Sequence, residues 1–244
     1  MESGNILKVA SSSPAMAAQL DGEGGRMRKN PTLICAPIMR ETVDKMLIDT
    51  HKAKASGADL VEIRLDSLKT FNPLQHLTAI IKHSPLPTLF TYRPTWEGGQ
   101  YDGDEKKRLE VLQLAMESGA DYIDVELKVA HEFNESIHGK KPKKCKVIVS
   151  SHNYQNTPSV EDLGNLVATI QAAGADIVKI ATTALDITDV ARLFQITVHS
   201  QVRSVCDKHN AFLTMFLVQA SSSPEMCDLM FSVGKLLNMV TFEA

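Results

Sequence analysis

Short apolar runs rich in β-branched residues alternate with longer amphipathic stretches from Pro31 onward. Between the runs lie helix-like stretches such as the one that follows Pro158, where acidic residues occupy the first turn and Leu163, Leu166 and Ile170 share one face. The apolar runs cover residues 33–38, 60–66, 88–93, 122–127, 146–152 and 176–183. Strand and helix in repeated alternation predict an α/β fold with a parallel sheet.

A repeated tripeptide narrows the choice of architecture. Gly-Ala-Asp occurs at residues 57–59, 119–121 and 174–176, each time between a helix-like stretch and an apolar run. Glycine suits the left-handed backbone that ends a helix, and the repeats lie about two strand–helix units apart. This regularity favours a (β/α)8 TIM barrel over an open doubly wound sheet, which more often carries a glycine-rich phosphate turn after its first strand. No such turn follows the first run.

Composition limits the partners that this chain is expected to have. Its 244 residues, 43% of them hydrophobic, are enough for one large core. The net charge of −3 gives no general attraction to nucleic acid or to anionic lipid, so we expect a small-molecule substrate, no nucleic acid and no membrane. The four cysteines are far apart without a Cys-x-x-Cys pair, so neither a disulfide framework nor a metal site is indicated.

Charged and polar residues interrupt the apolar runs near their carboxyl ends. In a parallel barrel these ends form one mouth, where barrel active sites lie. A single such residue is often part of an internal ion pair, but residues from five consecutive runs indicate a site. They are Glu62, Arg64, Arg93, Glu97 just beyond the third run, Asp124, Glu126, His152 and Lys179.

Lys179 is the most informative of these residues. A buried ammonium group without a partner costs several kcal/mol, so this lysine is either in a salt bridge or used as a neutral amine. Its structural alternative is an ion pair with Asp124 or Glu126. His152 is either a strand cap or a general base, and Glu62 with Arg64 forms either a closed salt bridge or a substrate contact. Glu97 is either part of the site or a solvated acidic residue of a loop. The basic stretch 140–144 is interpreted as a solvated loop.

Together these side chains fit imine catalysis. An amine whose pKa is lowered by burial and cationic neighbours attacks a ketone, and the iminium that results acidifies the adjacent carbon. A histidine then removes that proton and later protonates a departing hydroxyl group. Arginines would hold a carboxylate, so the expected substrate is an anionic keto acid.

Four motifs in this order resemble type I 3-dehydroquinate dehydratase, and they look like the plant form, in which this domain precedes a shikimate dehydrogenase domain. The resemblance extends from about Pro31 to Val202. The motifs are Val-Glu-Ile-Arg-Leu-Asp at 61–66, Phe-Thr-Tyr-Arg at 90–93 with Glu-Gly-Gly at 97–99, Val-Ser-Ser-His-Asn-Tyr at 149–154 and Val-Lys-Ile-Ala at 178–181.

The resemblance implies conversion of 3-dehydroquinate to 3-dehydroshikimate by syn elimination of water, in the shikimate pathway of aromatic amino acid biosynthesis, without a metal or organic cofactor. It implies that Lys179 forms the Schiff base, that His152 is the general base and acid, and that Glu97 orients His152. The substrate-binding residues that it implies are Glu62, Arg64, Arg93 and Asp124. The plant likeness also implies a chloroplast location. The first 30 residues, interpreted as a disordered leader, make a weak transit peptide because acidic residues interrupt them, so the cytoplasm is the alternative.

The resemblance ends near Arg203. Family members continue with a seventh strand, a Gly-x-x-Ser-Arg-type loop whose arginine binds the substrate carboxylate, and a Ser-Ala-Pro-Gly-Gln lid, and residues 203–244 contain none of these motifs. We therefore expect a barrel domain at 31–202 and a divergent tail at 203–244, with the last two strand–helix units divergent or incomplete. The apolar runs 211–218 and 239–242 are candidates for the vacant strands. No shikimate dehydrogenase domain is expected in this chain.

These differences lead to two expectations about function. The first is a dehydratase of impaired activity. The alternative is a catalytically silent truncated form that binds a ligand or partner, or has no function. A different Schiff-base lyase or aldolase on the same fold is a third interpretation, and the sequence indicates no oligomeric state.

Overall fold

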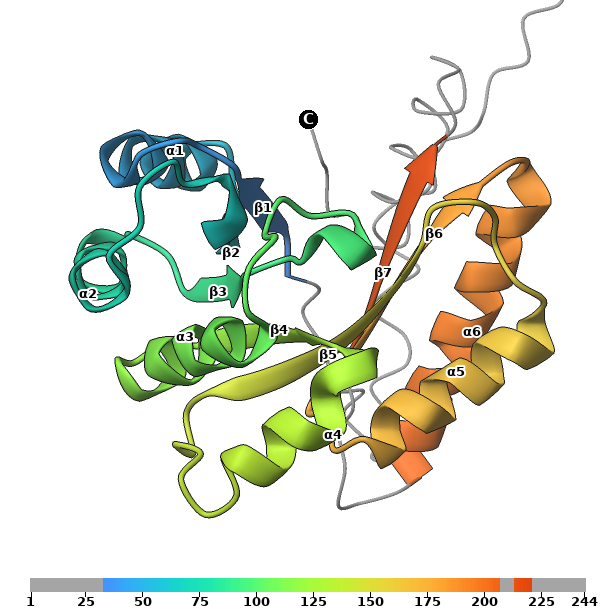
Figure 1. The fold of residues 1–244 in the computed structure, drawn as a ribbon. Coiled ribbons are helices and arrows are strands. Elements are labelled where there is room, and N and C mark those ends of the chain that lie inside the picture. Colours follow the sequence, from blue (N-terminus) through green and yellow to red (C-terminus); the bar gives the residue numbers. More distant parts are fainter. Residues whose placement is uncertain (1–32, 207–212, 221–244) are drawn as a thin grey trace, which may run out of the picture. The chain divides into compact units, whose positions relative to one another are not determined.

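The structure is a computed structural model that describes residues 33–206 and 213–220 (Figure 1). Strands and helices alternate along this part of the chain, as the apolar runs predicted. The elements are β1 (Cys35–Ile38), α1 (Val43–Ala55), β2 (Leu60–Arg64), α2 (Pro73–His83), β3 (Thr88–Thr91), α3 (Glu105–Glu117), β4 (Tyr122–Glu126), α4 (Leu127–Ser136), β5 (Lys146–Asn153), α5 (Val160–Ala172), β6 (Ile177–Ala184), α6 (Ile187–Cys206) and β7 (Leu213–Ala220). The predicted leader 1–30 and the run 239–242 lie outside the described residues.

The seven strands form one sheet in the order β1-β2-β3-β4-β5-β6-β7, and every neighbouring pair is parallel. The prediction of a parallel α/β sheet is therefore confirmed. Within the described residues the barrel is incomplete, because β1 and β7 are the two edges of the sheet. Strand β7 covers most of the predicted run 211–218 and pairs with β6 from Leu213 to Ala220. Closure of the barrel by the rest of the tail stays a prediction.

Local sequence signals explain where the helices begin and end. The side chains of Thr42, Asn72, Asp104 and Ser159 each accept a hydrogen bond from a backbone N–H of the first turn of α1, α2, α3 and α5 respectively. The glycines of the three Gly-Ala-Asp repeats have positive φ angles, of 93° at Gly57, 108° at Gly119 and 86° at Gly174. The repeat thus marks helix ends, as predicted.

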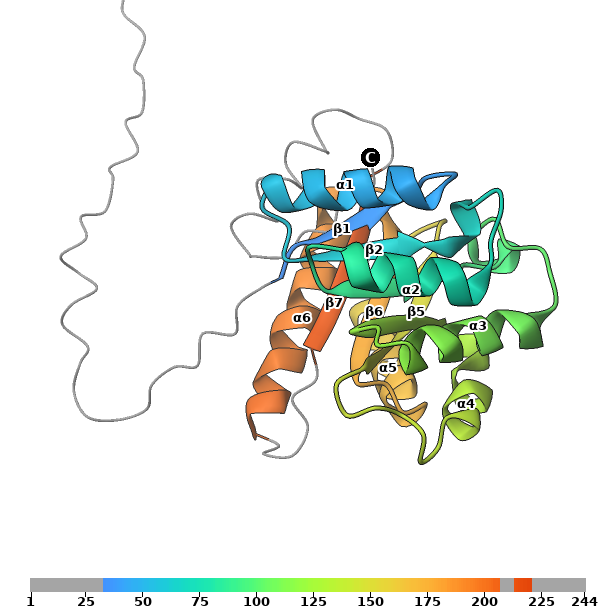
Figure 2. The ribbon, with the colours of Figure 1, turned by 90° about the vertical axis from the view of Figure 1, so that its left-hand side faces the viewer.

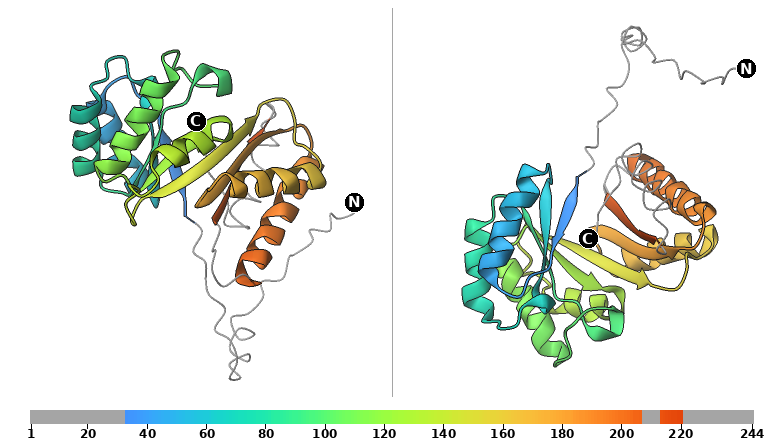
Figure 3. Two further views of the ribbon diagram at one scale, coloured as in Figure 1. Left: turned by 60° about the horizontal axis from the view of Figure 1, so that its bottom comes forward. Right: turned by 90° about the horizontal axis from the view of Figure 1, so that it is seen from above.

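The helices pack on one face of the sheet, which Figures 2 and 3 show from further directions. Alternate strand residues such as Ile63, Val125, Val149 and Ile180 form this face, and they belong to one buried apolar cluster with residues of α1 to α6. The period of two is that expected of strand side chains. No helix in the described ranges is both long enough and apolar enough to cross a membrane.

The opposite face of the sheet has two layers. A small apolar cluster, made of Cys35, Leu60, Leu89, Ile148 and Ile177, lies near the amino ends of the strands. Two residues further along each of these strands, the same face carries mostly polar side chains. Lys179 of β6 contacts Glu62 of β2, 117 residues away, although three strands lie between them in the sheet. The sheet is therefore strongly curled, and this concave polar layer is the candidate active site.

Candidate active site

Lys179 lies at the centre of the polar layer. Its Nζ donates hydrogen bonds to Asp124 Oδ2 at 2.9 Å and to Glu62 Oε1 at 3.2 Å, and only 4% of its side chain is exposed. Burial acts to lower the pKa of Lys179, but the carboxylates of Asp124 and Glu62 outweigh it and hold the pKa above its ordinary value. The sequence-based expectation of a lowered pKa is therefore wrong, and the ion-pair alternative applies, with Asp124 as one predicted partner and Glu62 in place of Glu126. Glu62 was not foreseen as a partner, because three strands separate β2 from β6 in the sheet.

Asp124 and Arg93 form the second part of the layer. Arg93 Nη2 donates to Asp124 Oδ1 at 2.9 Å, and Arg93 Nη1 donates to Glu126 Oε1 at 2.7 Å. Ser150 Oγ donates to Asp124 Oδ1 at 2.6 Å. Burial acts to raise the pKa of Asp124, but Arg93 and Lys179 outweigh it and hold the pKa well below its usual range. Asp124 is therefore a fixed negative charge.

Arg108 of α3 extends this network, and the sequence analysis missed it. It donates to the carbonyl oxygen of Tyr92 at 2.7 Å and pairs with Glu126 Oε2 at 2.7 Å, and both charged side chains have no exposed surface. The ion pair to Glu126 lacks hydrogen-bond alignment, since no hydrogen bond is made to Oε2. The sequence does indicate that Arg108 is buried, because it lies at helical spacing from Leu112 and Ala115 on the buried face of α3.

Arg64 and Asp66 form a separate ion pair at the end of β2. Arg64 Nε and Nη2 donate to the two oxygens of Asp66 at 3.0 and 2.8 Å. Asp66 also accepts backbone hydrogen bonds from Arg93 at 3.3 Å and Gln100 at 3.1 Å. Arg64 therefore forms its salt bridge with Asp66 rather than with Glu62, and a contact of Arg64 with the substrate stays a prediction. Asp66 thus fixes the loop that follows β3.

His152 and Glu97 form a hydrogen-bonded pair beside the layer. His152 Nδ1 lies 2.8 Å from Glu97 Oε1, and the same oxygen accepts the His152 backbone N–H at 3.1 Å. Burial, with the charges of Arg93 and Lys179, lowers the pKa of His152 to about 2, so the imidazole is neutral. Burial also raises the pKa of Glu97 to about 7. When Glu97 is ionised, the Nδ1–H donates to it and Nε2 is left as a proton acceptor.

Tyr154 and Gly98 hold this pair in place. Tyr154 Oη donates to the Glu97 carbonyl oxygen at 3.1 Å, and its ring stacks on His152 with centroids 6.0 Å apart. Gly98 has φ of 78°, and a Cβ there would lie 2.5 Å from Tyr154 Oη. The residue after Glu97 must therefore be glycine for two reasons, backbone conformation and space. A Cβ on Gly99 would meet the Arg93 backbone.

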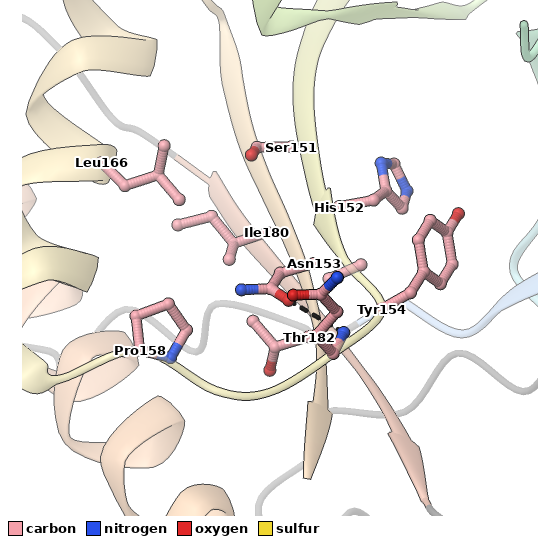
Figure 4. Close-up of a pocket in the computed structure, with 10 residues that line it drawn as sticks. Ser151, His152, Asn153, Tyr154, Pro158, Leu166, Ile180 and Thr182 are labelled. Carbon is pink, nitrogen blue, oxygen red and sulfur yellow. Dashed lines mark hydrogen bonds between the residues drawn. The ribbon is translucent and has the colours of Figure 1, made fainter. Parts of the chain in front are cut away.

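A cavity of about 490 Å³ lies next to His152 at the carboxyl end of β5. Figure 4 shows His152 and Tyr154 on one side of β5 and Ser151 on the other, towards Leu166 of α5 and Ile180 of β6. Lys179 does not line this cavity. The cavity therefore belongs mainly to the helix-covered face, and the contacts of Lys179 define the candidate site.

The structure thus brings together most of the predicted site residues. Lys179 contacts both Glu62 and Asp124, Arg93 joins them through Asp124, and Glu97 contacts His152. Arg93 and Asp124 are 3% and 0% exposed, and both terminal nitrogens of Arg93 and both oxygens of Asp124 are hydrogen-bonded within this layer. Thr91, Ser150 and Arg108 were missed. No group of three or more His, Cys, Asp or Glu side chains is placed to hold a metal ion in the part of the chain that the structure describes.

Comparisons with known proteins agree on one family. The sequence model described as type I 3-dehydroquinase matches residues 34–207. The chain is 65% identical over 207 residues, 79% of its length, to the chloroplastic bifunctional 3-dehydroquinate dehydratase/shikimate dehydrogenase of Arabidopsis thaliana, and covers 34% of that protein. It is 34% identical over 164 residues to the 3-dehydroquinate dehydratase of Desulfotalea psychrophila, covering 67% of this chain and 70% of that protein. The chain thus spans about a third of the first relative and about two thirds of the second.

Solved structures give the same fold. The 3-dehydroquinate dehydratase of Enterococcus faecalis matches with a TM-score of 0.68 and 23% identity over 86% of this chain and 87% of that one. The type I enzyme of Clostridium difficile matches with a TM-score of 0.66 and 24% identity over 85% and 92% of the two chains. At these identities the likeness concerns the fold alone.

Proposed function

This chain belongs to the type I 3-dehydroquinase family, and from that membership we propose that it is a hydro-lyase that converts 3-dehydroquinate to 3-dehydroshikimate in the shikimate pathway. The observation that carries the proposal is the buried amine of Lys179, held among carboxylates on the concave face of a parallel sheet. His152 lies on the neighbouring strand β5 and is bonded to Glu97, which follows β3. An imine-forming dehydratase needs an amine and a proton acceptor in this relation.

The roles follow from the contacts. Lys179 forms an iminium with the ketone of the substrate, and this electron sink acidifies the adjacent carbon. Neutral His152 removes a proton there through Nε2 and returns it to the departing hydroxyl group, which leaves as water. Glu97 fixes the tautomer of the imidazole through Nδ1. Glu62 and Arg64 are proposed to contact substrate, while Arg93 and Asp124 position Lys179.

We also propose that turnover is reduced. The resemblance implies a carboxylate-binding arginine in a Gly-x-x-Ser-Arg-type loop and a Ser-Ala-Pro-Gly-Gln lid, and residues 203–244 contain neither motif. Loss of a buried arginine–carboxylate contact costs about 2–5 kcal/mol, which lowers kcat/KM by about 30-fold to 5,000-fold. Steady-state assays beside the Desulfotalea psychrophila enzyme would measure this difference. Equal values of kcat/KM would contradict the proposal of reduced turnover.

Trapping with borohydride tests the activity itself. After incubation with 3-dehydroquinate and sodium borohydride, mass spectrometry is expected to find a reduced adduct on the peptide that contains Lys179. Lys179→Met should abolish the adduct, whereas the matched change Lys106→Met at an exposed helix position should not. A folded sample that forms no adduct would favour the alternative of a catalytically silent binding protein.

We propose a chloroplast location because the Arabidopsis thaliana relative is named as a chloroplastic protein. The residues that would carry a targeting signal lie outside the described part of the chain. Fusion of the first 40 residues to a fluorescent protein in plant cells would test the location. Cytoplasmic fluorescence would contradict it. The proposed partner is the small-molecule substrate.

A further inference from the structure

Lys179 presents a chemical problem for the proposed function. Two carboxylates hold its side chain as an ammonium ion, and an ammonium ion has no lone pair with which to attack a ketone. Some group must therefore accept a proton from Nζ before an imine can form. The groups within hydrogen-bond distance of Nζ in the described residues are Asp124 and Glu62.

Asp124 is poorly suited to accept this proton. Its two oxygens already accept three hydrogen bonds, from Arg93 Nη2, Ser150 Oγ and Lys179 Nζ. Its side chain has no exposed surface. A proton on Asp124 would remove the charge that compensates buried Arg93, and a buried cation without its partner is costly. Asp124 is therefore a permanent counter-ion.

Glu62 differs from Asp124 in its hydrogen bonds and in its exposure. Its side chain is 12% exposed, and its Oε1 accepts hydrogen bonds from Thr91 Oγ1 at 2.6 Å and from Lys179 Nζ at 3.2 Å. No described residue donates a hydrogen bond to Oε2. A protonated Glu62 would keep its contact with Thr91 and would leave no arginine uncompensated, since Arg64 pairs with Asp66.

We propose that Glu62 is the catalytic residue that accepts the proton of Lys179 and returns it to the oxygen that leaves the substrate ketone, while Asp124 stays ionised. This inference rests on the proposed imine chemistry. The ammonium group has three protons. One passes to Glu62, and the neutral amine adds to the carbonyl carbon. Glu62 gives this first proton to the carbonyl oxygen, then takes a second proton from the nitrogen and gives it to the same oxygen, which departs as water. The iminium nitrogen keeps the third proton, and Glu62 ends as a carboxylate.

The surroundings leave this task to Glu62. His152 and Glu97 are bonded to each other and are assigned to the carbon-bound proton. Among the residues that the structure describes, the other charged or titratable groups that act on Lys179 or Glu62 are Arg93, Arg64 and the thiol of Cys35, whose pKa burial raises above its ordinary value. None of these three groups is a base near neutral pH.

The test compares the rates at which an imine forms on Lys179. Each variant is mixed with 3-dehydroquinate or, separately, with glyoxylate, and quenched with cyanoborohydride at set times, and the adduct is quantified by mass spectrometry. Glu62→Gln keeps the shape of the side chain and removes its base, so imine formation should slow by about 10²-fold to 10⁴-fold. Added acetate should restore part of the rate, because Glu62 is partly exposed. Glu110→Gln, at an exposed position of α3, should form adduct at the unaltered rate.

The outcomes distinguish the role proposed for Glu62 from the proposed dehydratase function. An unchanged rate in Glu62→Gln, or a slow rate that acetate does not restore, would overturn the role of Glu62. Adduct with glyoxylate but not with 3-dehydroquinate would leave this role intact and contradict the proposed substrate. Adduct with neither probe in the unaltered chain would overturn both proposals. If Glu62→Gln does not fold, Glu62→Asp, which keeps the base but shortens its reach, should give an intermediate rate; a rate equal to that of the unaltered chain would contradict the proposal.

Discussion

Replacement of Arg108 by methionine tests whether the buried ion network holds the fold together. Arg108 has no exposed surface; it donates a hydrogen bond to the Tyr92 carbonyl oxygen and forms an ion pair with Glu126. Methionine fills most of the same space but provides neither charge nor hydrogen-bond donors. The change therefore leaves Glu126 with Arg93 as its remaining cation, and it leaves the Tyr92 carbonyl oxygen without this donor.

The expected loss is large relative to the stability of a domain. Removal of one partner from a buried ion pair costs about 3–5 kcal/mol, whereas a domain is stable by about 5–15 kcal/mol in total. For a chain of this size that loss corresponds to a fall in Tm of about 6–20 °C. The third partner, Glu105, is 37% exposed, so its pair with Arg108 should contribute about 1 kcal/mol or less.

Urea denaturation followed by circular dichroism measures the free energy of unfolding of the unaltered chain, Arg108→Met and the control Glu105→Gln. We expect a loss of several kcal/mol in the first variant and a small one in the control. Because the pair to Glu126 is buried, the loss should change little between low and high salt. A loss below about 1 kcal/mol in Arg108→Met would refute the reasoning, since it would place the pair among exposed ones.

Three further outcomes are expected. Below pH 7 a proton on Glu97 reverses its hydrogen bond to the imidazole of His152, so kcat/KM should rise with pH up to about 7 and then level off. Glu97→Gln should remove this rise from the pH–rate profile, and a rise that persists would show that Glu97 is not its cause. Gly98→Ala should lower stability by about 1–3 kcal/mol through its positive φ and the contact with Tyr154, measured by urea denaturation, and an unaffected stability would contradict the conformation. Burial raises the pKa of the thiol of Cys145 to about 11 and also raises the pKa of the thiol of Cys35. Iodoacetamide should therefore label both cysteines in urea but not in the native protein, which peptide mapping measures. Labelling of either cysteine in the native protein would contradict its burial.

The sequence predicted the order and type of the elements well because the strand signal is local. A strand in a parallel sheet is apolar on both faces, so it forms a continuous run that stands out from an amphipathic helix. The predicted ends of the strands and helices were less accurate. The run 122–127 was taken as one strand, but Leu127 begins α4, and the stretch after Pro158 becomes helical at Val160, with Ser159 as its cap.

The candidate site was predictable in its membership but not in its charge states. Lys179 was recognised from the cost of burial alone, but the direction of its pKa depends on Glu62 and Asp124, whose places relative to it are set by the curvature of the sheet. Arg108 was missed because the run of charges around it resembles a solvated helix face. The salt-bridge partner of Arg64 could not be chosen between Glu62 and Asp66 without the turn that follows β2.

The position of Lys179 on the sixth strand also has a consequence for the order in which the chain is made. Glu62 and Asp124 precede Lys179 by 117 and 55 residues, so both carboxylates are synthesised before their shared cation. At about 5–20 residues per second, a ribosome would need about 6–23 s to pass from Glu62 to Lys179. During that time the nascent sheet has an unbalanced negative charge on its inner face. Pairing of β6 neutralises that charge at the same moment as it extends the sheet, so electrostatic attraction and strand pairing favour the same step, before β7 is added.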